Sequence, residues 1–362
     1  MPDDYKYDTQ SIFFEGVKKM AVKDIVLGLS NANGPSGAEG SAARLAMELL
    51  SDFTPVVRDS LGNVMAELGD PNSQNHILID AHIDEIGLVV TDIDGDGFLH
   101  IAPCGGVDRR VMMGSEVTVM SKSKINGVIC CRPPHLTRSE DTSKVPEFKD
   151  MAVDIGYSAD KARELVPIGT RIAFRSRPAS LLGSRVSGKA LDNRAGAAAI
   201  IRTVELLEPK CSRLDCRVTA LLSTREEVGH LAAGCAAFTA APTQAIVVDM
   251  GFAQYPGCPD EVCGKLGEGP MIGFSPVLSR AISKKLTSIA DEQGIKWQYD
   301  VCGGRTGTNA DDIAVTAGGI PCGLISIAQR NMHTPVETVD CDDVEKTAQL
   351  LAAYIRCGGI GQ

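Results

Sequence analysis

Short apolar runs, each bounded by polar residues or glycine, recur along most of this chain of 362 residues. Continuous apolar runs of this kind are typical of strands that are covered on both faces. Helical stretches separate several of the runs, and this alternation predicts an α/β fold with a mainly parallel central sheet. The clearest runs are HILID (76–80), VTALL (218–222), AIVVD (245–249) and GLISI (323–327).

Two stretches between the runs have the period of a helix. In SAARLAMELLSDF (41–53), apolar residues recur at the three- and four-residue spacing that places them on one stripe. The alanine-rich stretch RAGAAAIIRTVELL (194–207) shows a similar pattern. Each stretch therefore predicts an amphipathic helix with one apolar face toward the sheet. In the second stretch, the residues predicted to share that face are Ala197, Ile200, Ile201, Val204 and Leu207.

Residues 88–177 break this pattern. They contain turn signals, DIDGDG and KSKING, and alternating stretches such as GSEVTVMS and GTRIAFRS, with hardly any helical period. We predict that this segment is a small β-rich domain, barrel-like or PDZ-like, inserted into a layered α/β/α catalytic domain. The catalytic domain would then be discontinuous, formed by residues 1–87 and 178–362.

Composition narrows the possible partners and locations. The formal net charge is −10 and the acidic residues are scattered, which argues against nucleic acid and against an anionic membrane surface as partners. The start, MPDDYKYDTQSIFFEG, is too polar for a signal peptide, so we expect a cytoplasmic protein. Twelve cysteines occur without a CxxC pair, and we expect most of them to be reduced core residues.

Histidines and carboxylates lie at the ends of the apolar runs. In open α/β sheets, sites form beyond the carboxyl ends of the strands, so these side chains are predicted to meet at one edge. A further acid precedes the alanine-rich helix in KALDNRAG (189–196). The candidates, in chain order, are His82, Asp84, Asp192, Glu226, Glu227, Asp249 and His333.

Metal binding explains why acids would be gathered at one edge. Two imidazoles and three carboxylates suit one or two zinc-class ions, and two neighbouring ions share a bridging carboxylate and water. Asp84 could orient His82 from behind, and one glutamate of the Glu226–Glu227 pair could bind metal while the other acts as a base. Taken singly, each residue has a simpler interpretation: a solvated turn for the glutamates and a helix cap for Asp249.

The remaining motifs have no assigned chemistry. DIDGDG resembles the start of a calcium loop, but the twelfth position of that loop is Pro103, where a glutamate is required, so a hairpin turn is predicted. We assign no role to His76, His100 and His135. His230 lies close to the glutamate pair and is expected to be solvated or to support it from outside the first ring of ligands.

Six motifs occur in an order that resembles the tetrahedral aminopeptidases, metallopeptidase family forty-two. This family is also labelled glutamyl or leucyl aminopeptidase, and sometimes endoglucanase. The likeness covers nearly the whole chain, and the ordered set is more specific than any single motif. The motifs are AHIDEIG (81–87), KALDNRAG (189–196), TREEVG (224–229), VVDMG (247–251), GRTGTNAD (304–311) and RNMHTPVE (330–337).

The resemblance implies a zinc-peptidase-like catalytic domain with two divalent ions per chain, most readily zinc, with cobalt or manganese as alternatives. It implies that His82 and Asp249 hold one ion, that Glu227 and His333 hold the second, and that Asp192 bridges them. Glu226 would then be the general base and Asp84 a support for His82. It also implies that the insertion forms a dimer contact and that six dimers assemble into a dodecamer.

The expected function is therefore removal of N-terminal residues from short peptides. A metal-dependent deacylase or amidase on the same scaffold, a metal-independent glycoside hydrolase and a catalytically inert assembly protein are the alternatives. Three positions depart from the family pattern: Asn309 stands where an acid is common, Asn331 where a tyrosine is common, and His230 where a leucine is common. These departures remove no expected ligand, but they weaken any inference about side-chain preference from the family.

Overall fold

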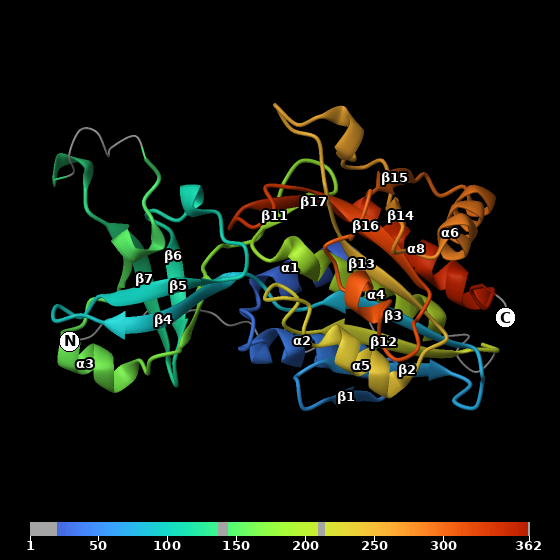
Figure 1. Ribbon diagram of the computed structural model, residues 1–362, viewed down its shortest axis with the longest axis horizontal. Coiled ribbons are helices and arrows are strands. Elements are labelled where there is room, and N and C mark those ends of the chain that lie inside the picture. The colour runs from blue at the N-terminus through green and yellow to red at the C-terminus, as the bar shows by residue number, and fades with distance from the viewer. Residues whose placement is uncertain (1–19, 137–143, 209–213, 361–362) are drawn as a thin grey trace.

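The structure is a computed structural model that describes residues 20–136, 144–208 and 214–360. Figure 1 shows a helix-covered sheet on one side of the molecule and a smaller group of strands on the other. The polar start that argued against a signal peptide and Cys211 lie outside the described residues. None of the described helices has the length and apolar content that crossing a membrane requires.

The large sheet has eleven strands, nine of which form one continuous path. β14 (Met271–Phe274) pairs with β16, and β15 (Gln298–Val301) pairs with β14. Across the sheet, the nine strands are β1 (Val56–Arg58), β2 (Val64–Gly69), β12 (Arg217–Ser223), β3 (His76–His82), β13 (Gln244–Phe252), β16 (Cys322–Arg330), β17 (Glu337–Asp340), β11 (Arg185–Gly188) and β10 (Ala179–Ser180).

The four clearest apolar runs form the centre of this sheet. They correspond to β12, β3, β13 and β16, which lie side by side in this order, and each neighbouring pair is parallel. The flanking strands pair antiparallel, however, as in β2 with β12 and β16 with β17. The sheet is therefore mixed, and parallel pairing holds for its central four strands and for the β14–β15 pair. The flanking strands are short and partly exposed, so they lack the buried apolar run that marks a central strand.

Helices cover the sheet through two separate apolar clusters. One cluster contains buried side chains of α1 (Val22–Asn31), α2 (Gly40–Ser51), α4 (Leu191–Leu207), α6 (Arg280–Gln293) and α8 (Cys341–Arg356). The other contains side chains of α5 (Ala233–Ala240) and α7 (Ala310–Ile313). Neighbouring residues of β3 divide between the clusters, with Ile77 and Ile79 in the first and Leu78 in the second. This alternation places the two clusters on opposite faces of the sheet.

Both predicted helices form, with differences in detail. α2 ends at Ser51, before Phe53, which packs against the core from the following turn. α4 is buried on all sides from Leu191 to Val204, and not along one stripe. Its small alanine and glycine side chains allow β3, β13 and neighbouring helices to approach it closely, so an amphipathic pattern was the wrong expectation for this helix.

The segment predicted to be β-rich forms a closed barrel of six strands in the order β4-β5-β8-β7-β6-β9. Its own apolar cluster fills the interior. DIDGDG forms the turn between the first two strands, as predicted, and one short helix, α3 (Ala159–Leu165), interrupts the strands. The strands are β4 (Gly87–Ile93), β5 (Leu99–Cys104), β6 (Glu116–Met120), β7 (Lys124–Cys131), β8 (Met151–Asp154) and β9 (Arg171–Phe174).

Short 3₁₀ turns and the cysteines complete the description. The turns lie at Arg109–Val111, Pro134–Leu136, Phe148–Asp150 and Asp260–Val262. The eleven described cysteines form no disulfide bonds, as expected. Their expected place in the core is wrong for most of them, because only Cys104, Cys216, Cys322 and Cys341 are buried.

Candidate metal centre

The central parallel strands bring the first two candidate ligands together. His82 is the last residue of β3, and Asp249 lies within the neighbouring strand β13. Val247 pairs with Asp80, so His82 and Asp249 lie two residues further along their strands, on the same face. His82 Nε2 is 3.8 Å from Asp249 Oδ1, and both residues are buried. His76, at the opposite end of β3, contacts Thr219 instead.

Asp192 lies between the two predicted imidazole ligands. Its Oδ1 is 3.1 Å from His82 Nε2, and its Oδ2 is 3.5 Å from His333 Nε2. It belongs to the first turn of α4, where Asp192 and Asn193 have non-helical backbone angles before the regular helix begins. One carboxylate thus faces both histidines, although 141 residues separate Asp192 from His333 in the chain.

Asp84 holds the two adjacent glutamates in place. Its Oδ1 accepts a hydrogen bond from the backbone N–H of Glu226 at 3.1 Å, and its Oδ2 accepts one from Glu227 at 3.2 Å. Ser36 donates a further hydrogen bond to Oδ2 at 2.6 Å. The same carboxylate lies 3.4 Å from His82 Nδ1, so Asp84 contacts a predicted ligand and the turn that carries the glutamate pair. Although burial by itself raises the pKa of Asp84, its contacts with His82, Ser36 and the Glu226 N–H together hold the pKa below its usual value.

His333 reaches the centre from a loop beyond β16. Its Nε2 is 3.4 Å from Glu227 Oε2, and its Nδ1 is 2.9 Å from the carbonyl oxygen of Gly106, which follows β5 of the barrel. A Cβ at Gly106 would lie 2.7 Å from His333 Nδ1, so only glycine fits there without displacing the ring. The barrel therefore supplies one wall of the centre.

Glu337 fixes the backbone of this loop and the backbone of Asp192 at the start of α4. Its Oε1 accepts from the N–H of His333 at 2.9 Å, and its Oε2 accepts from the N–H of Asp192 at 3.0 Å. The residue is buried at the start of β17. Sequence reasoning assigned it no role, although it ends the motif RNMHTPVE. His333 has a left-handed backbone conformation, and the position of Glu337 beside it could not be inferred from sequence spacing alone.

Two compact groups of potential ligand atoms result. One comprises His82, Asp192 and Glu227, and the other comprises His82, Glu226 and Asp249; within each group the ligand atoms lie within 4.8 Å of one another. His82 belongs to both groups. His333 belongs to neither, but its contacts with Asp192 and Glu227 place it against the first. All seven predicted residues therefore meet at one place.

The electrostatics of the cluster suit bound cations. Burial raises the pKa of Glu227 well above its usual value, and the charge of Asp192 raises it further. Burial likewise raises the pKa of Asp249, and repulsion from Glu226 adds to this shift. Burial lowers the pKa of His82, but the surrounding acids Glu226, Asp192, Asp84 and Asp249 together outweigh it and the net shift is upward. Imidazole and carboxylate donors are those that zinc-class ions prefer, and such ions would offset the repulsion among these acids.

Several residues around the centre have positive φ although they are not glycine. They include Ala190 beside Asp192 (φ 56°), Arg225 before the glutamate pair (φ 59°), His230 (φ 58°) and His333 (φ 62°). Such conformations cost roughly 1–3 kcal/mol each and occur where the surrounding structure enforces them, commonly at functional sites. Here they turn the chain in three segments, beside Asp192, around the glutamate pair and at His333, so that side chains from these segments converge.

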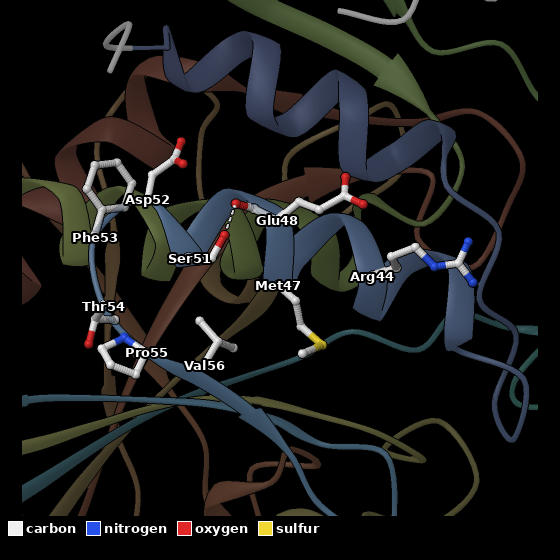
Figure 2. Close-up of a pocket in the computed structure, with 9 residues that line it drawn as sticks. All are labelled: Arg44, Met47, Glu48, Ser51, Asp52, Phe53, Thr54, Pro55 and Val56. Atoms are coloured by element: carbon white, nitrogen blue, oxygen red, sulfur yellow. Dashed lines mark hydrogen bonds between the residues drawn. The ribbon is translucent and has the colours of Figure 1, made fainter. Parts of the chain in front are cut away.

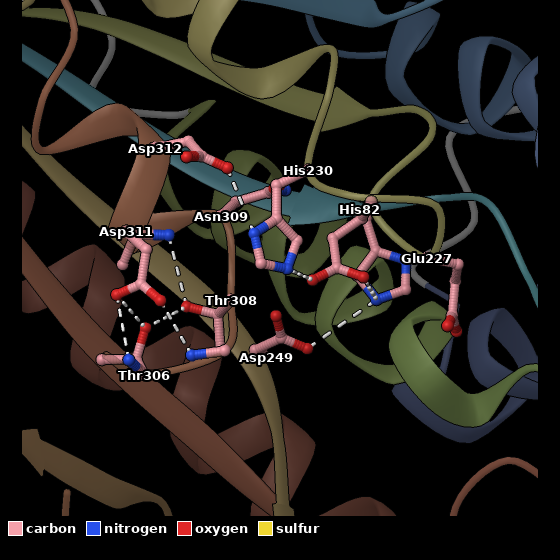
Figure 3. A network of polar contacts seen from close by, with 12 residues as sticks. His82, Glu227, His230, Asp249, Thr306, Thr308, Asn309, Asp311 and Asp312 are labelled. Atoms are coloured by element: carbon pink, nitrogen blue, oxygen red, sulfur yellow. Dashed lines mark hydrogen bonds and ion pairs between the residues drawn. The ribbon is translucent and has the colours of Figure 1, made fainter. Parts of the chain in front are cut away.

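His230 contacts the glutamate pair directly. Its Nε2 is 3.1 Å from Glu226 Oε1, and its Nδ1 is 3.1 Å from Asp312 Oδ2. In Figure 3, His230 lies between Asp312 on one side and His82 and Asp249 on the other. Hydrogen bonding to Glu226 raises the pKa of the imidazole. Asp312, at the first turn of α7, was not anticipated from the sequence, because only the fold brings it close to residue 230.

The departure at position 309 has a buried partner. The side-chain amide of Asn309 donates to Asp80 at 2.8 Å and to Ser223 at 2.9 Å. Burial raises the pKa of Asp80 to about 6. An amide at position 309 therefore suits a neighbour that is itself a buried acid, where a second carboxylate would add repulsion.

A surface groove elsewhere lacks this chemistry. It has a volume of about 670 Å³ and runs along α2 and β1. Figure 2 shows Arg44, Glu48 and Asp52 beside Met47, Phe53 and Val56 on its wall. None of the seven predicted site residues lines it. The clustered histidines and carboxylates, and not this groove, form the candidate functional site.

Comparison with known proteins places the whole arrangement in one family. Residues 62–350 match the model of the M42 glutamyl aminopeptidase family. The chain belongs to this family. The match includes each of the seven site residues, and it makes the protein a peptide hydrolase of the aminopeptidase type.

Individual relatives agree with the family assignment. The lysyl aminopeptidase of Pyrococcus furiosus is 30% identical over 89% of this chain and 93% of its own length. The Pyrococcus horikoshii TET1 peptidase, which can assemble into a tetrahedron or a large octahedral shell, is 32% identical with a TM-score of 0.83 over 92% of this chain and 99% of its own. A Thermotoga maritima protein described as an endoglucanase is 28% identical with a TM-score of 0.75, covering 92% and 97% of the two chains. The two solved structures share the fold of this chain over nearly its full length.

Proposed function

We propose that this M42 family member is a dinuclear metal-dependent aminopeptidase that removes N-terminal residues from short peptides. The observation that carries the proposal is the position of Asp192, whose two carboxylate oxygens lie 3.1 Å from His82 and 3.5 Å from His333. A carboxylate that faces two imidazoles, each with further acids beside it, has the surroundings expected of a ligand that bridges two ions.

The remaining ligands divide between the two sides of Asp192. His82 and Asp249 would hold one ion, and Glu227 and His333 would hold the second. Glu226 also lies 3.8 Å from His82 Nε2, but its other oxygen contacts His230, so we assign it to proton transfer and not to coordination. Asp84 would orient His82 and position both glutamates through their backbone N–H groups.

The chemistry follows from this division. When bound, two divalent ions would supply Lewis acidity and lower the pKa of the attacking water. Glu226 takes a proton from that water as the oxygen attacks the scissile carbonyl carbon. As the C–N bond breaks, Glu226 returns the proton to the leaving nitrogen, so a single carboxylate serves as base and then as acid. The surrounding carboxylates attract the free amino group of the substrate, which favours cleavage at the N-terminus.

Quaternary structure forms part of the proposal. We propose that the chain is a homo-oligomer, and specifically a dodecamer built from six dimers, with the inserted domain at the dimer contact. Similarity to the TET1 peptidase supports this assembly. The division into residues 1–87 with 178–362 and residues 88–177 stays a prediction. Sedimentation velocity would distinguish a dodecamer from a dimer.

The central test is a panel of aminoacyl-anilides, assayed with metal-stripped protein after zinc, cobalt or manganese is restored. We expect chelation to abolish turnover and one of these ions to restore it, with two ions bound per chain. Glu226→Gln should abolish turnover and retain both ions, because the amide cannot accept the water's proton. Appreciable turnover by the purified variant would contradict the assigned base.

The same panel tests the alternatives. N-acylated amino acids serve as substrates for a deacylase, and preferential cleavage of these blocked compounds would favour that activity. A soluble cellulose derivative, assayed in the presence of chelator, tests glycoside hydrolysis without metal. Absence of turnover on every substrate, together with failure to bind two ions, would favour an assembly protein.

A further inference from the structure

His230 occupies an unusual position relative to the proposed general base. It lies four residues after Glu226, in a tight turn in which the carbonyl oxygen of Glu226 accepts hydrogen bonds from Gly229 and His230, both at 2.9 Å. Positive φ angles of 115° at Gly229 and 58° at His230 close this turn. The turn directs the imidazole back onto the Glu226 carboxylate, where Nε2 meets Oε1 at 3.1 Å.

The other ring nitrogen is held from a distant segment. Asp312 Oδ2 lies 3.1 Å from Nδ1, and Arg305 Nη2 lies 3.4 Å from Oδ1 of the same carboxylate. A carboxylate accepts hydrogen bonds and does not donate them when ionised, so each ring nitrogen of His230 serves as an N–H donor. The imidazole is thus fixed at both ends, and its side chain is only 21% exposed.

The two oxygens of Glu226 consequently face different neighbours. Oε1 meets His230, whereas Oε2 lies 3.8 Å from His82 Nε2, on the side of the ligand cluster. An exact placement of the reacting oxygen matters, because a displacement of about 1 Å can cost roughly 100-fold in rate. A leucine at position 230 would offer Oε1 no donor and leave the carboxylate free to rotate.

We propose that His230 and Asp312 form a positioning pair for the general base of this enzyme. His230 donates from Nε2 to Glu226 Oε1 and from Nδ1 to Asp312, and this leaves Glu226 Oε2 directed at the attacking water. The inference rests on the proposed function, since it requires Glu226 to transfer the proton. The pair requires a histidine at position 230 and an aspartate at position 312. It links the TREEVG turn to the GRTGTNADD loop.

The first experiment compares His230→Leu with His230→Gln, both as the metal-loaded full-length chain. Leucine removes both donors, and we expect kcat to fall roughly 10- to 100-fold with KM within about twofold. Glutamine keeps an N–H donor and should recover most of the loss. His100→Leu is the matched control, because His100 is a barrel residue whose side chain is 41% exposed and contacts Asp94; it should leave kcat unchanged.

A second readout separates positioning from simple structural support. Departure of an amine requires a proton from Glu226, whereas departure of an aryl oxide from an ester does not. His230→Leu should therefore lose more activity on an aminoacyl amide than on the aryl ester of the same amino acid. Equal losses on both substrates would overturn the positioning role.

A third readout tests whether Asp312 acts through His230. Asp312→Ala alone should lower kcat by about three- to tenfold, less than His230→Leu, because its carboxylate does not contact Glu226. In the His230→Leu background, Asp312→Ala should have no further effect. Additive losses would show that the two residues act separately and would overturn the pair.

Metal content distinguishes the remaining outcomes. Zinc titration should give two ions per chain for His230→Leu, as for the unaltered protein. Loss of an ion, a change confined to KM, or normal kcat in a folded variant would each overturn the inference. If Glu226→Gln were active or turnover resisted chelation, the proposed function itself would fail. An inactive Glu226→Gln enzyme with a normal His230→Leu enzyme would leave the proposed function intact and reject only the pair.

Discussion

The two histidines of the centre are held in opposite ways. His82 ends a central strand, its side chain is 2% exposed, and its outer nitrogen faces Asp84. His333 lies on a loop with φ 62°, its side chain is 32% exposed, and its outer nitrogen faces a backbone carbonyl of the barrel. Neighbouring central strands carry both expected ligands of the His82 side, His82 and Asp249, whereas the His333 side needs the loop, Glu337 and the barrel together.

This difference implies unequal rigidity and unequal metal affinity. Ligands on packed strands are pre-organised, so little ordering is needed when an ion binds. Ligands on a partly exposed loop lose more freedom on binding, which weakens affinity. We therefore expect the ion on the His82 side to bind more tightly and the ion on the His333 side to leave first as chelator is added.

Asp192→Ala should have the largest effect, because this residue contacts both sides. We expect loss of both ions and a fall in kcat of roughly 1,000-fold or more, since Lewis acidity and water activation disappear together. Metal analysis after gel filtration measures the first effect and anilide hydrolysis the second. Asp52→Ala, at an exposed aspartate after α2, is the control. Retention of one tightly bound ion would contradict the bridging position of Asp192.

Replacing each histidine by alanine should separate the two sides. Without metal, His82→Ala is expected to lower the free energy of unfolding by about 2–3 kcal/mol, because Asp84 and its neighbours lose a buried partner. His333→Ala should cost less than about 1 kcal/mol, since the ring is partly exposed. Both variants should be nearly inactive. Urea unfolding in EDTA measures the difference, and equal destabilisation would show that the two sides are equally embedded.

Gly106→Ala should damage only the His333 side. The added methyl group would lie 2.7 Å from Nδ1 and push the ring away, so we expect weaker binding of one ion and about tenfold lower kcat at limiting zinc. Gly95→Ala is the matched control, because a Cβ there meets nothing within 4 Å. Zinc titration by calorimetry would reveal the change. Weakening of both sites to the same extent would mean that the barrel supports the whole centre.

Ser36→Ala should give the smallest effect, on the His82 side. It removes the 2.6 Å hydrogen bond to Asp84 Oδ2, which still accepts from Glu227. We expect a loss of about 1 kcal/mol in the free energy of unfolding and a two- to fivefold lower kcat. Chemical denaturation and steady-state kinetics measure both. A loss as large as that of His82→Ala would show that Asp84 depends on Ser36 more than on the histidine.

The sequence predicted the His82 side better than the His333 side, and the reason is physical. Buried parallel strands leave a continuous apolar run, and their carboxyl ends meet at one edge, so His82 and Asp249 could be placed from pattern alone. The sequence pattern is weaker for the antiparallel flanking strands, for the burial of α4 on all sides and for the short helix of the barrel. These three features were missed. The β-rich character of residues 88–177 could be recognised from their alternating pattern and turn signals.

The contacts around His333 depend on tertiary structure that no local pattern encodes. Gly106 is one of two adjacent glycines after β5, a signal for close approach but not for the partner that approaches. Glu337 and Asp312 look like ordinary surface acids in the sequence, and only the fold makes one a backbone clamp and the other a partner of His230. The resemblance to a family implied the metal ligands, but it did not imply Gly106, Glu337 and Asp312 as residues that support them.

The Gly106 carbonyl beside His333 has a consequence for engineering chimeras. A barrel transplanted from another M42 protein must place the segment after β5 at the same point. Otherwise the host protein loses the contact that holds the His333 side of the candidate centre. Grafts joined outside the Gly105–Gly106 segment would replace this wall along with the barrel. Exchanges that keep these two residues from the host are therefore the ones in which barrels can be swapped without rebuilding the catalytic machinery.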